Sequence, residues 1–267
     1  MKVWAVANQK GGVGKTTTAV TLAGLLAEQG CRTLLVDMDP HGSLTSYFGL
    51  DPDDLEDSIY NFFQAVANGS EIDPAPVIRE TRVNHLYLAP ASMALATLDR
   101  QLGIRKGTGL VMVKALRALE GRFERVLIDC PPVLGVLMIN ALAACEKLLI
   151  PVQTEFLARK GLERMLKTLE MVQRSGGEAL PRLIIPTLYD RRTRASVDSW
   201  AALRKAYPRE LWDTTIPVDT AFRDASKAGL PLSMLRPKSR GVCAYRKLLD
   251  DLLKMEQGVV ELRAQAS

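Results

Sequence analysis

The sequence predicts a doubly wound α/β fold, in which a mostly parallel sheet is flanked by helices. Short apolar runs rich in β-branched residues recur along the chain, helical patterns separate most of them, and a glycine-rich turn follows the first run. Near-continuous apolar runs are typical of strands covered on both faces. We expect one domain over residues 1–258, followed by a tail at 259–267 that frays.

The predicted elements alternate from the N-terminus onward. The predicted strands are Val3–Ala7, Thr33–Val36, Leu86–Ala89, Arg125–Ile128, Leu148–Val152, Leu183–Thr187 and Thr215–Val218. The predicted helices are Lys15–Glu28, Gly107–Leu119, Leu137–Cys145, Gly161–Arg174 and Ser196–Tyr207. Gly30 is favoured just past a helix end, so the first helix is expected to stop there. The segment 51–80 is acidic and contains three prolines, which indicates a surface insertion and not part of the sheet.

Composition is that of a soluble globular protein, with 47% hydrophobic and 24% charged residues. No apolar run is long enough for a bilayer, and no signal-peptide pattern precedes the first strand. The four cysteines form no C-x-x-C pair, which argues against a zinc ribbon or a disulfide scaffold. We therefore expect a cytoplasmic protein.

Positive charge gathers in the C-terminal half. The segment from Glu155 to Arg209 holds twelve Lys and Arg residues against six Asp and Glu residues. A basic face of this kind attracts a polyanion such as DNA, but it also arises from solvated helix faces. Charge alone leaves both interpretations open.

The stretch "NQKGGVGKTTT" lies where a phosphate-binding loop belongs, between a predicted strand and a predicted helix. It fits the pattern G-x-x-x-x-G-K-[ST] except at the first glycine, where Gln9 stands. Lys15 is expected at the β- and γ-phosphates, and the Thr16 hydroxyl is placed to bind Mg²⁺. Glycines let backbone N–H groups turn toward phosphate oxygens at the positive end of a helix. The predicted nucleotide contacts are Gly11, Gly12, Val13, Gly14, Lys15, Thr16 and Thr17.

Carboxylates follow two further strands. "RVLIDCPP" places Asp129 at the carboxyl edge of the sheet, where it can hold Mg²⁺ directly or through water. "TLLVDMDPHGSLT" presents Asp37 and Asp39 two residues apart, so they point the same way on an extended strand and could orient an attacking or metal-bound water. We take Thr16, Asp37 and Asp129 as metal ligands. For Asp37 and Asp39 the alternative is a turn cap at the strand end.

These motifs together resemble the deviant Walker-A ATPases of the ParA/MinD group, and most closely its ParA (Soj) branch. The resemblance rests on "KGGVGKTTT", "LLVDMDPHGSLTSYFGL", "VLIDCPPVLGVLMINALAACEKLLIPVQTEFLARKGLERML" and "SRGVCAYRKLLDDLL", which together extend over nearly the whole chain. In that family the loop lacks the first glycine and carries a signature lysine, which Lys10 matches. The resemblance implies that Lys10 reaches the ATP of a partner subunit, as an arginine finger does. It also implies that Asp39 positions the hydrolytic water and that Asp129 is the Walker-B acid.

The resemblance further implies an ATP-dependent homodimer that positions cargo on DNA, with hydrolysis triggered by a ParB-like partner. "LYDRRTRAS" keeps the family's D-x-R-T segment, so Arg191, Arg192 and Arg194 are candidate DNA contacts, unless this is only a solvated loop. The tail "DDLLKMEQGVVELRAQAS" has four acids among its six charges, and Gly258 is expected to interrupt its helix. We therefore expect no membrane anchor.

Two segments depart from the family pattern. Where relatives have "IPRNVRLSEA", this chain reads "IPVDTAFRDA", so Val218 and Ala221 replace arginines and Arg223 is the nearest base. The same loop approaches adenine in the family, which implies base contacts by Pro217 and Asp219. "DPHGSLT" replaces the common "DPQGNAT". These changes resemble ParA-type proteins of chemotaxis or flagellar systems, whose cargo is a polar protein array, so both the nucleoid and the cell pole are expected locations.

Other classes of protein share the phosphate loop. A synthetase of the cobyrinic acid diamide or dethiobiotin type needs a pocket for an acid substrate and often an amidotransferase domain with a Cys/His pair, which the sequence does not reveal. An iron–sulfur carrier needs paired cysteines, and Cys130 and Cys145 do not form a C-x-x-C motif. An inert nucleotide-binding scaffold would lose Lys10 or Asp39, and both are present. The sequence therefore favours the ATPase.

Overall fold

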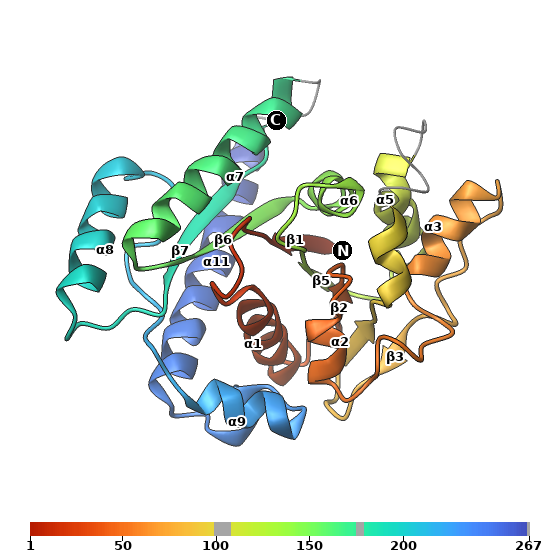
Figure 1. Cartoon of the computed structure of the whole chain (residues 1–267), viewed down its shortest axis with the longest axis horizontal. Coiled ribbons are helices and arrows are strands. Elements are labelled where there is room, and N and C mark those ends of the chain that lie inside the picture. The colour runs from red at the N-terminus through yellow and green to blue at the C-terminus, as the bar shows by residue number, and fades with distance from the viewer. Residues whose placement is uncertain (99–107, 175–178, 266–267) are drawn as a thin grey trace.

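A computed structural model describes residues 1–98, 108–174 and 179–265 and shows a seven-stranded sheet in the order β3-β4-β2-β5-β1-β6-β7 (Figure 1). The strands are β1 (Lys2–Val6), β2 (Thr33–Asp37), β3 (Arg79–Glu80), β4 (Leu86–Ala89), β5 (Arg125–Asp129), β6 (Lys147–Gln153) and β7 (Arg182–Thr187). Neighbouring strands are parallel except β3 and β4, which are antiparallel. The predicted doubly wound, mostly parallel sheet is confirmed.

Alternation along each strand sends side chains into two separate cores. Val3 and Ala5 of β1 pack on one face of the sheet, and Trp4 and Val6 pack on the other. The first face is covered by α3 (Tyr60–Ala67), α5 (Val111–Ala118), α6 (Val136–Ala144) and α7 (Phe156–Arg174), with α8 (Arg194–Ala206) at its margin. The second face is covered by α1 (Lys15–Glu28), α9 (Ala221–Ala228), α10 (Leu232–Leu235) and α11 (Arg240–Gln265). Burial on both faces explains why the strands are almost continuously apolar.

Helix α1 has the bounds that the sequence predicts. It ends because Gly30, at φ 81°, reverses the chain while the N–H groups of Gly30 and Cys31 donate to the carbonyls of Ala27 and Leu26. Helices α6, α7 and α8 match their predictions within five residues. The predicted helix at Gly107–Leu119 corresponds to a short 3₁₀ turn, Thr108–Leu110, followed by α5, and Gly107 lies outside the described residues.

The predicted strand at Thr215–Val218 is wrong. This segment makes only an isolated bridge between Pro217 and Tyr189 and then turns into α9, where the N–H of Ala221 donates to the Asp219 carboxylate. Strand β3 was not predicted, because two residues carry no readable alternation.

The segment 51–80 contains α3, a helix that was not predicted from the sequence. Ile59, Phe62 and Phe63 around this helix are buried in the first core, so the segment contributes to packing and is not solely a surface insertion. Its acidic residues before Ser58 lie on its outer side, partly or fully exposed.

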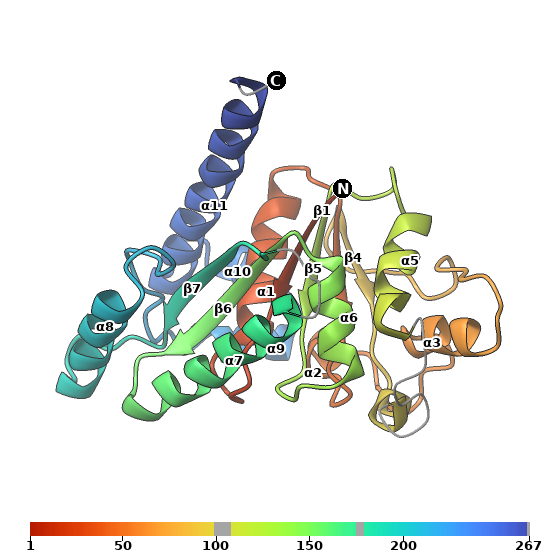
Figure 2. The same ribbon diagram turned by 90° about the horizontal axis from the view of Figure 1, so that it is seen from above.

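Helix α11 runs through Gly258 to Gln265, so the expected interruption at Gly258 is wrong, while the fraying of the tail at 259–267 stays a prediction. One glycine lowers helix stability by about 1 kcal/mol relative to alanine without ending the helix. Figure 2 shows the C-terminal part of α11 extending beyond the rest of the fold. Among the described helices, none is both long and apolar enough to cross a membrane.

Candidate functional site

The carboxyl ends of β1, β2, β5 and β6 meet at one edge of the sheet, and the loop after β1 lies there. In this loop Gly12 and Gly14 have φ values of 74° and 90°, which disfavour any residue with a side chain. A Cβ atom built on Gly11, Gly12 or Gly14 would meet no atom within 4 Å. The glycines therefore give the loop its shape and leave open space over its backbone.

The first half of the loop is fixed by side chains. Asn8, fully buried, donates from Nδ2 to the Pro151 carbonyl and accepts from the N–H of Lys10. Gln9 donates from Nε2 to Oγ1 of Thr168 on α7 at 2.8 Å. Gln9 is not among the residues with positive φ, so this position does not require a glycine. The missing glycine of the common pattern is replaced by an anchored side chain.

The two lysines of the loop lie in different places. Lys15 is buried at the start of α1, with Nζ 3.5 Å from the Lys10 carbonyl oxygen, so it folds back over the loop. Lys10 instead points toward the end of β6, where its ammonium pairs with Glu155. The second half of the loop is held by β7, because Thr187 Oγ1 donates to the Val13 carbonyl at 2.8 Å.

Asp129 ends β5 directly beside the first turn of α1. Its Oδ2 accepts a 2.5 Å hydrogen bond from the Thr16 hydroxyl, while its Oδ1 is buried without a partner. Burial, and secondly the charge of Asp37, raises the pKa of Asp129 to about 8. A buried carboxylate oxygen that lacks a donor is a position that a cation would satisfy.

Asp37 is the register neighbour of Asp129 on β2 and is also fully buried. Its Oδ2 accepts from the N–H and the hydroxyl of Thr45, and its Oδ1 accepts from the N–H of Asp39. Burial raises its pKa to about 6. The turn-cap interpretation describes these contacts, because Asp37 ties the strand end to α2 (Ser43–Tyr47).

Asp39 lies past the end of β2, in a turn. Alternation along a strand therefore does not set its direction, contrary to the i, i+2 argument from sequence. Its Oδ1 accepts from the N–H of His41 and lies 2.8 Å from Nδ1 of the same residue, whose side chain is 80% exposed. The Asp39 side chain itself is 15% exposed and Asp37 is fully buried, so Asp39 is the more accessible of the two, as a group that orients water must be.

The donor set fits Mg²⁺ held with a polyphosphate. Within the described residues no three His, Cys, Asp or Glu side chains form a metal cage. Mg²⁺ is usually held by one or two carboxylates, a hydroxyl, waters and substrate phosphates, and Thr16 with the unsatisfied oxygen of Asp129 supplies that minimum.

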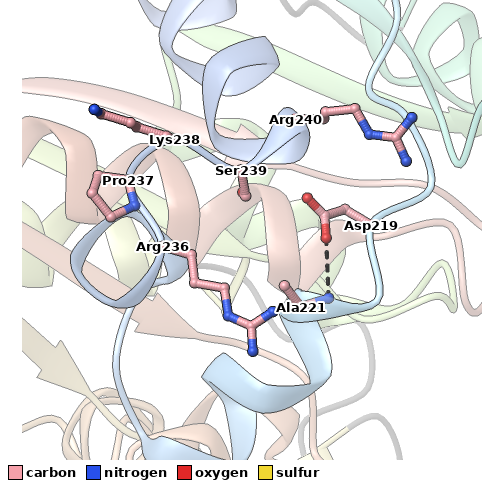
Figure 3. A pocket seen from close by; sticks show the side chains of 7 residues that line it. All are labelled: Asp219, Ala221, Arg236, Pro237, Lys238, Ser239 and Arg240. Atoms are coloured by element: carbon pink, nitrogen blue, oxygen red, sulfur yellow. Dashed lines mark hydrogen bonds between the residues drawn. The ribbon is translucent and has the colours of Figure 1, made fainter.

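The predicted adenine contacts lie in the loop before α9. The Asp219 carboxylate accepts from the N–H groups of Ala221 and Gly241, which joins the starts of α9 and α11. Pro217 is half-buried in the bridge to Tyr189. A cavity of about 520 Å³ adjoins Asp219, and Figure 3 shows Arg236 and Arg240 beside this acid. Adenine contacts by Pro217 and Asp219 stay predictions.

The candidate DNA arginines are not equivalent. Arg192 makes a double contact with its neighbour Asp190, at 2.8–3.3 Å, and this interaction is the main cause that lowers the pKa of Asp190 to about 2. Arg194 lies 3.5 Å from Asp198, whereas Arg191 and Arg223 are exposed and make no ion pair within the described ranges.

Several residues of the site were not predicted from the sequence: Thr45, Gln153, Glu155, Thr168, Thr187, Arg236, Lys238 and Arg240. They belong to other segments, and only the fold brings them to the loop, to Asp37 or to Asp219. The one available signal was the basic run "LRPKSR".

Comparisons with known proteins identify the family of this chain. A family model described as an AAA domain matches residues 1–181. The sporulation initiation inhibitor protein Soj of Bacillus subtilis is 34% identical, covering 94% of this chain and 98% of that protein. The chromosome partitioning protein ParA of Caulobacter vibrioides is also 34% identical, over 96% of each protein.

A solved structure from Mycobacterium smegmatis, described as cobyrinic acid a,c-diamide synthase with bound ADP and magnesium, is 36% identical. It covers 96% of both chains with a TM-score of 0.82. The name of that protein belongs to the class we weighed as an alternative. Four curated relatives with Soj or ParA names nonetheless each cover 92–96% of this chain, and the chain belongs to the ParA/MinD family of ATPases, in its ParA/Soj branch.

Proposed function

We propose that this chain binds ATP and Mg²⁺ at the loop after β1, closes into a homodimer in that state, and uses hydrolysis to time the release of a positioned cargo. The separation of the two lysines carries this proposal. Lys15 folds over the loop, and Lys10 lies outside it against the end of β6. A phosphate loop needs one lysine for its own nucleotide, so Lys10 is the lysine that can serve a second subunit once its pair with Glu155 opens.

Each residue has a definite role in this proposal. Backbone N–H groups from Gly11 to Thr17 hold the phosphates, and Lys15 neutralises charge on the β- and γ-phosphates. Thr16 and Asp129 hold Mg²⁺, with Asp37 behind them, directly or through water. The metal, when bound, offsets the charge that develops on the phosphate oxygens. Asp39 orients the attacking water.

The face around the loop suits a second copy of the chain. Val133 and Leu134, which follow β5, and Phe156, which begins α7, have exposed fractions of 65%, 42% and 74%. Phe156 directly follows the acid that pairs with Lys10. Large apolar side chains exposed at a functional edge are typical of interaction sites.

Sedimentation with a non-hydrolysable ATP analogue and Mg²⁺ tests the dimer. We expect a shift from monomer to dimer in the wild type and its loss in Lys10→Ala, while a fluorescent nucleotide still binds the variant. A wild type that stays monomeric at high protein concentration would refute the proposal.

DNA is the cargo contact that the charge distribution favours. Arg191, Arg223, Lys238 and Arg240 are exposed and make no ion pair within the described part of the chain. Hydrogen bonds join their loops: the N–H of Val218 donates to the Tyr189 carbonyl, and the N–H of Gly241 donates to the Asp219 carboxylate. The loops at 188–194, 217–223 and 236–240 thus form one basic edge.

Duplex binding at two salt concentrations tests this edge. Phosphate contacts predict affinity that falls steeply with salt, and replacing Lys238 and Arg240 with glutamine should weaken binding for any sequence and flatten the salt dependence. Binding that is absent even at low salt would favour the other cargo that the sequence suggests, a polar chemotaxis or flagellar protein array. Either cargo requires a partner protein that triggers hydrolysis, at the nucleoid or at the cell pole.

The second candidate is an acid-dependent synthetase, because the Mycobacterium smegmatis relative carries that name. This reading requires ATP consumption that depends on cobyrinic acid and an ammonia source. ADP release that is indifferent to both would exclude it.

A further inference from the structure

Lys10 is engaged within its own subunit. Its ammonium pairs with Glu155, and its Nζ lies 3.4 Å from Oε1 of Gln153. Gln153 ends β6 and Glu155 lies two residues further on, just before α7. An ammonium held here cannot at the same time contact a nucleotide in another subunit.

The stem of Lys10 also fits a notch in α7. A Cβ atom built on Gly161 would lie 3.2 Å from the Lys10 Cβ and 3.6 Å from Asn8 Oδ1. Gly161 is absent from the residues with positive φ, so its backbone does not require a glycine. The space that it leaves is filled by the lysine stem.

We propose that Glu155, assisted by Gln153 and the notch at Gly161, is a positioning residue that retains Lys10 until the nucleotide of a second subunit competes for it. This inference rests on the proposed role of Lys10 across the dimer. It adds a resting state for Lys10. Glu155 restrains dimerisation, and the nucleotide of the second subunit must take its place as the partner of Lys10.

The environment of the pair makes it releasable. The side chains of Lys10 and Glu155 are 27% and 38% exposed, so water screens their attraction. Ion pairs of this kind change an equilibrium by a factor of about two to five. A triphosphate carries several negative charges and therefore offers the ammonium a stronger partner than one carboxylate.

Chemical labelling tests the resting contact without nucleotide. The Lys10 amine, held by the Glu155 carboxylate and the Gln153 amide, should react slowly with an acylating reagent. Glu155→Gln should therefore raise the labelling rate of Lys10 about two- to fivefold. Mass spectrometry measures this rate. Glu146→Gln is the matched control, because Glu146 pairs with Lys2 at 2.8 Å on the opposite edge of the sheet. That variant should leave Lys10 unchanged. Equal Lys10 rates in wild type and Glu155→Gln would overturn the proposal.

Dimerisation tests the consequence. With the ATP analogue and Mg²⁺, Glu155→Gln should lower the dimer dissociation constant by about two- to fivefold per subunit, and Glu146→Gln should not. Removing an acid near a nucleotide could also act through general repulsion, so the change is repeated in Lys10→Ala. There Glu155→Gln should have no effect and should not restore a lost dimer. A weaker dimer in Glu155→Gln, or a restored one in the double variant, contradicts the inference.

The two measurements also separate this inference from the proposed function. A wild type that never dimerises would end the proposed function, while labelling would still decide whether Glu155 holds Lys10.

Discussion

Asp129 makes the stability of the nucleotide-free protein depend on pH. Its pKa is raised from 3.8 to about 8, first by burial and then by the charge of Asp37. In the unfolded chain the carboxyl group regains its ordinary pKa. Between these two values the folded protein binds a proton that the unfolded chain does not, so the free energy of unfolding must fall as pH rises.

The size of the effect follows from the same two values. A full proton difference changes the free energy of unfolding by about 1.4 kcal/mol per pH unit. With a folded pKa near 8, the Asp129 carboxyl is almost fully protonated at pH 6 and about half protonated at pH 8. The loss between pH 6 and pH 8 is therefore about 2 kcal/mol.

Asp129→Asn removes this titration but not the packing. An amide oxygen can still accept from Thr16, while the amide nitrogen takes the position of the unpartnered oxygen and costs about 1–3 kcal/mol at every pH. The slope with pH, not the absolute stability, is thus the informative quantity. Asp213→Asn, on the surface, is the control.

Urea unfolding in a chelating buffer at pH 6, 7 and 8 measures the slope. We expect the wild type and the Asp213 variant to lose about 2 kcal/mol over this range, and Asp129→Asn to lose only a small part of that. Parallel slopes in all three proteins would refute the reasoning. Added Mg²⁺ and ADP should flatten the wild-type slope, because a bound cation favours the ionised carboxylate.

Three further predictions concern the frame around the site. Gly30→Ala forces a side chain into a left-handed conformation and should lower the free energy of unfolding by about 1 kcal/mol in urea titrations, without changing nucleotide affinity. Glu256→Gln removes the charge that anchors α11 to Arg125 at 2.8 Å, and it should lower the melting temperature more at low salt than at high salt. Tyr245→Phe leaves the buried Thr18 hydroxyl without its 2.8 Å partner, and we expect a loss of about 1–3 kcal/mol, with much less when combined with Thr18→Val.

The sequence was sufficient for the parallel sheet, because strands buried on both faces keep one unmistakable apolar pattern. Short or locally paired elements could not be predicted from this pattern. Thr215–Val218 has the composition of a strand but forms a single bridge. Strand β3 has only two residues and is defined by its antiparallel pairing with β4. Helix α3 was hidden because acidic residues and prolines flank a short buried stretch around Phe62.

The residues of the site also fall into two groups, those that the sequence predicts and those that it does not. Residues within one motif, such as Lys15 and Thr16, could be assigned because strand, turn and helix fix their relative positions. Glu155 and Thr45 could not, since contacts with Lys10 and Asp37 arise only when separate strand ends meet at the sheet edge. The i, i+2 argument for Asp39 failed because the strand ends before it.

Gln9 offers a direct test of why the loop does without its first glycine. The side chain donates to Thr168 on α7 at 2.8 Å, and the backbone there has no positive φ. Gln9→Gly, which restores the common pattern, should therefore lower stability by about 1–2 kcal/mol, by losing a hydrogen bond and freeing the unfolded backbone.

Thr168→Val separates the two contributions to this loss, because it removes the hydrogen bond without altering the loop backbone. We expect Thr168→Val to cost less than Gln9→Gly, and Gln9→Gly alone to weaken nucleotide binding, since a freer loop must be ordered around the phosphates. The checks are urea unfolding and titration of a fluorescent nucleotide. A Gln9→Gly protein as stable as the wild type, with equal nucleotide affinity, would mean that the side chain does not hold the loop. The interpretation of Gln9 as the anchor that replaces a glycine would then fail.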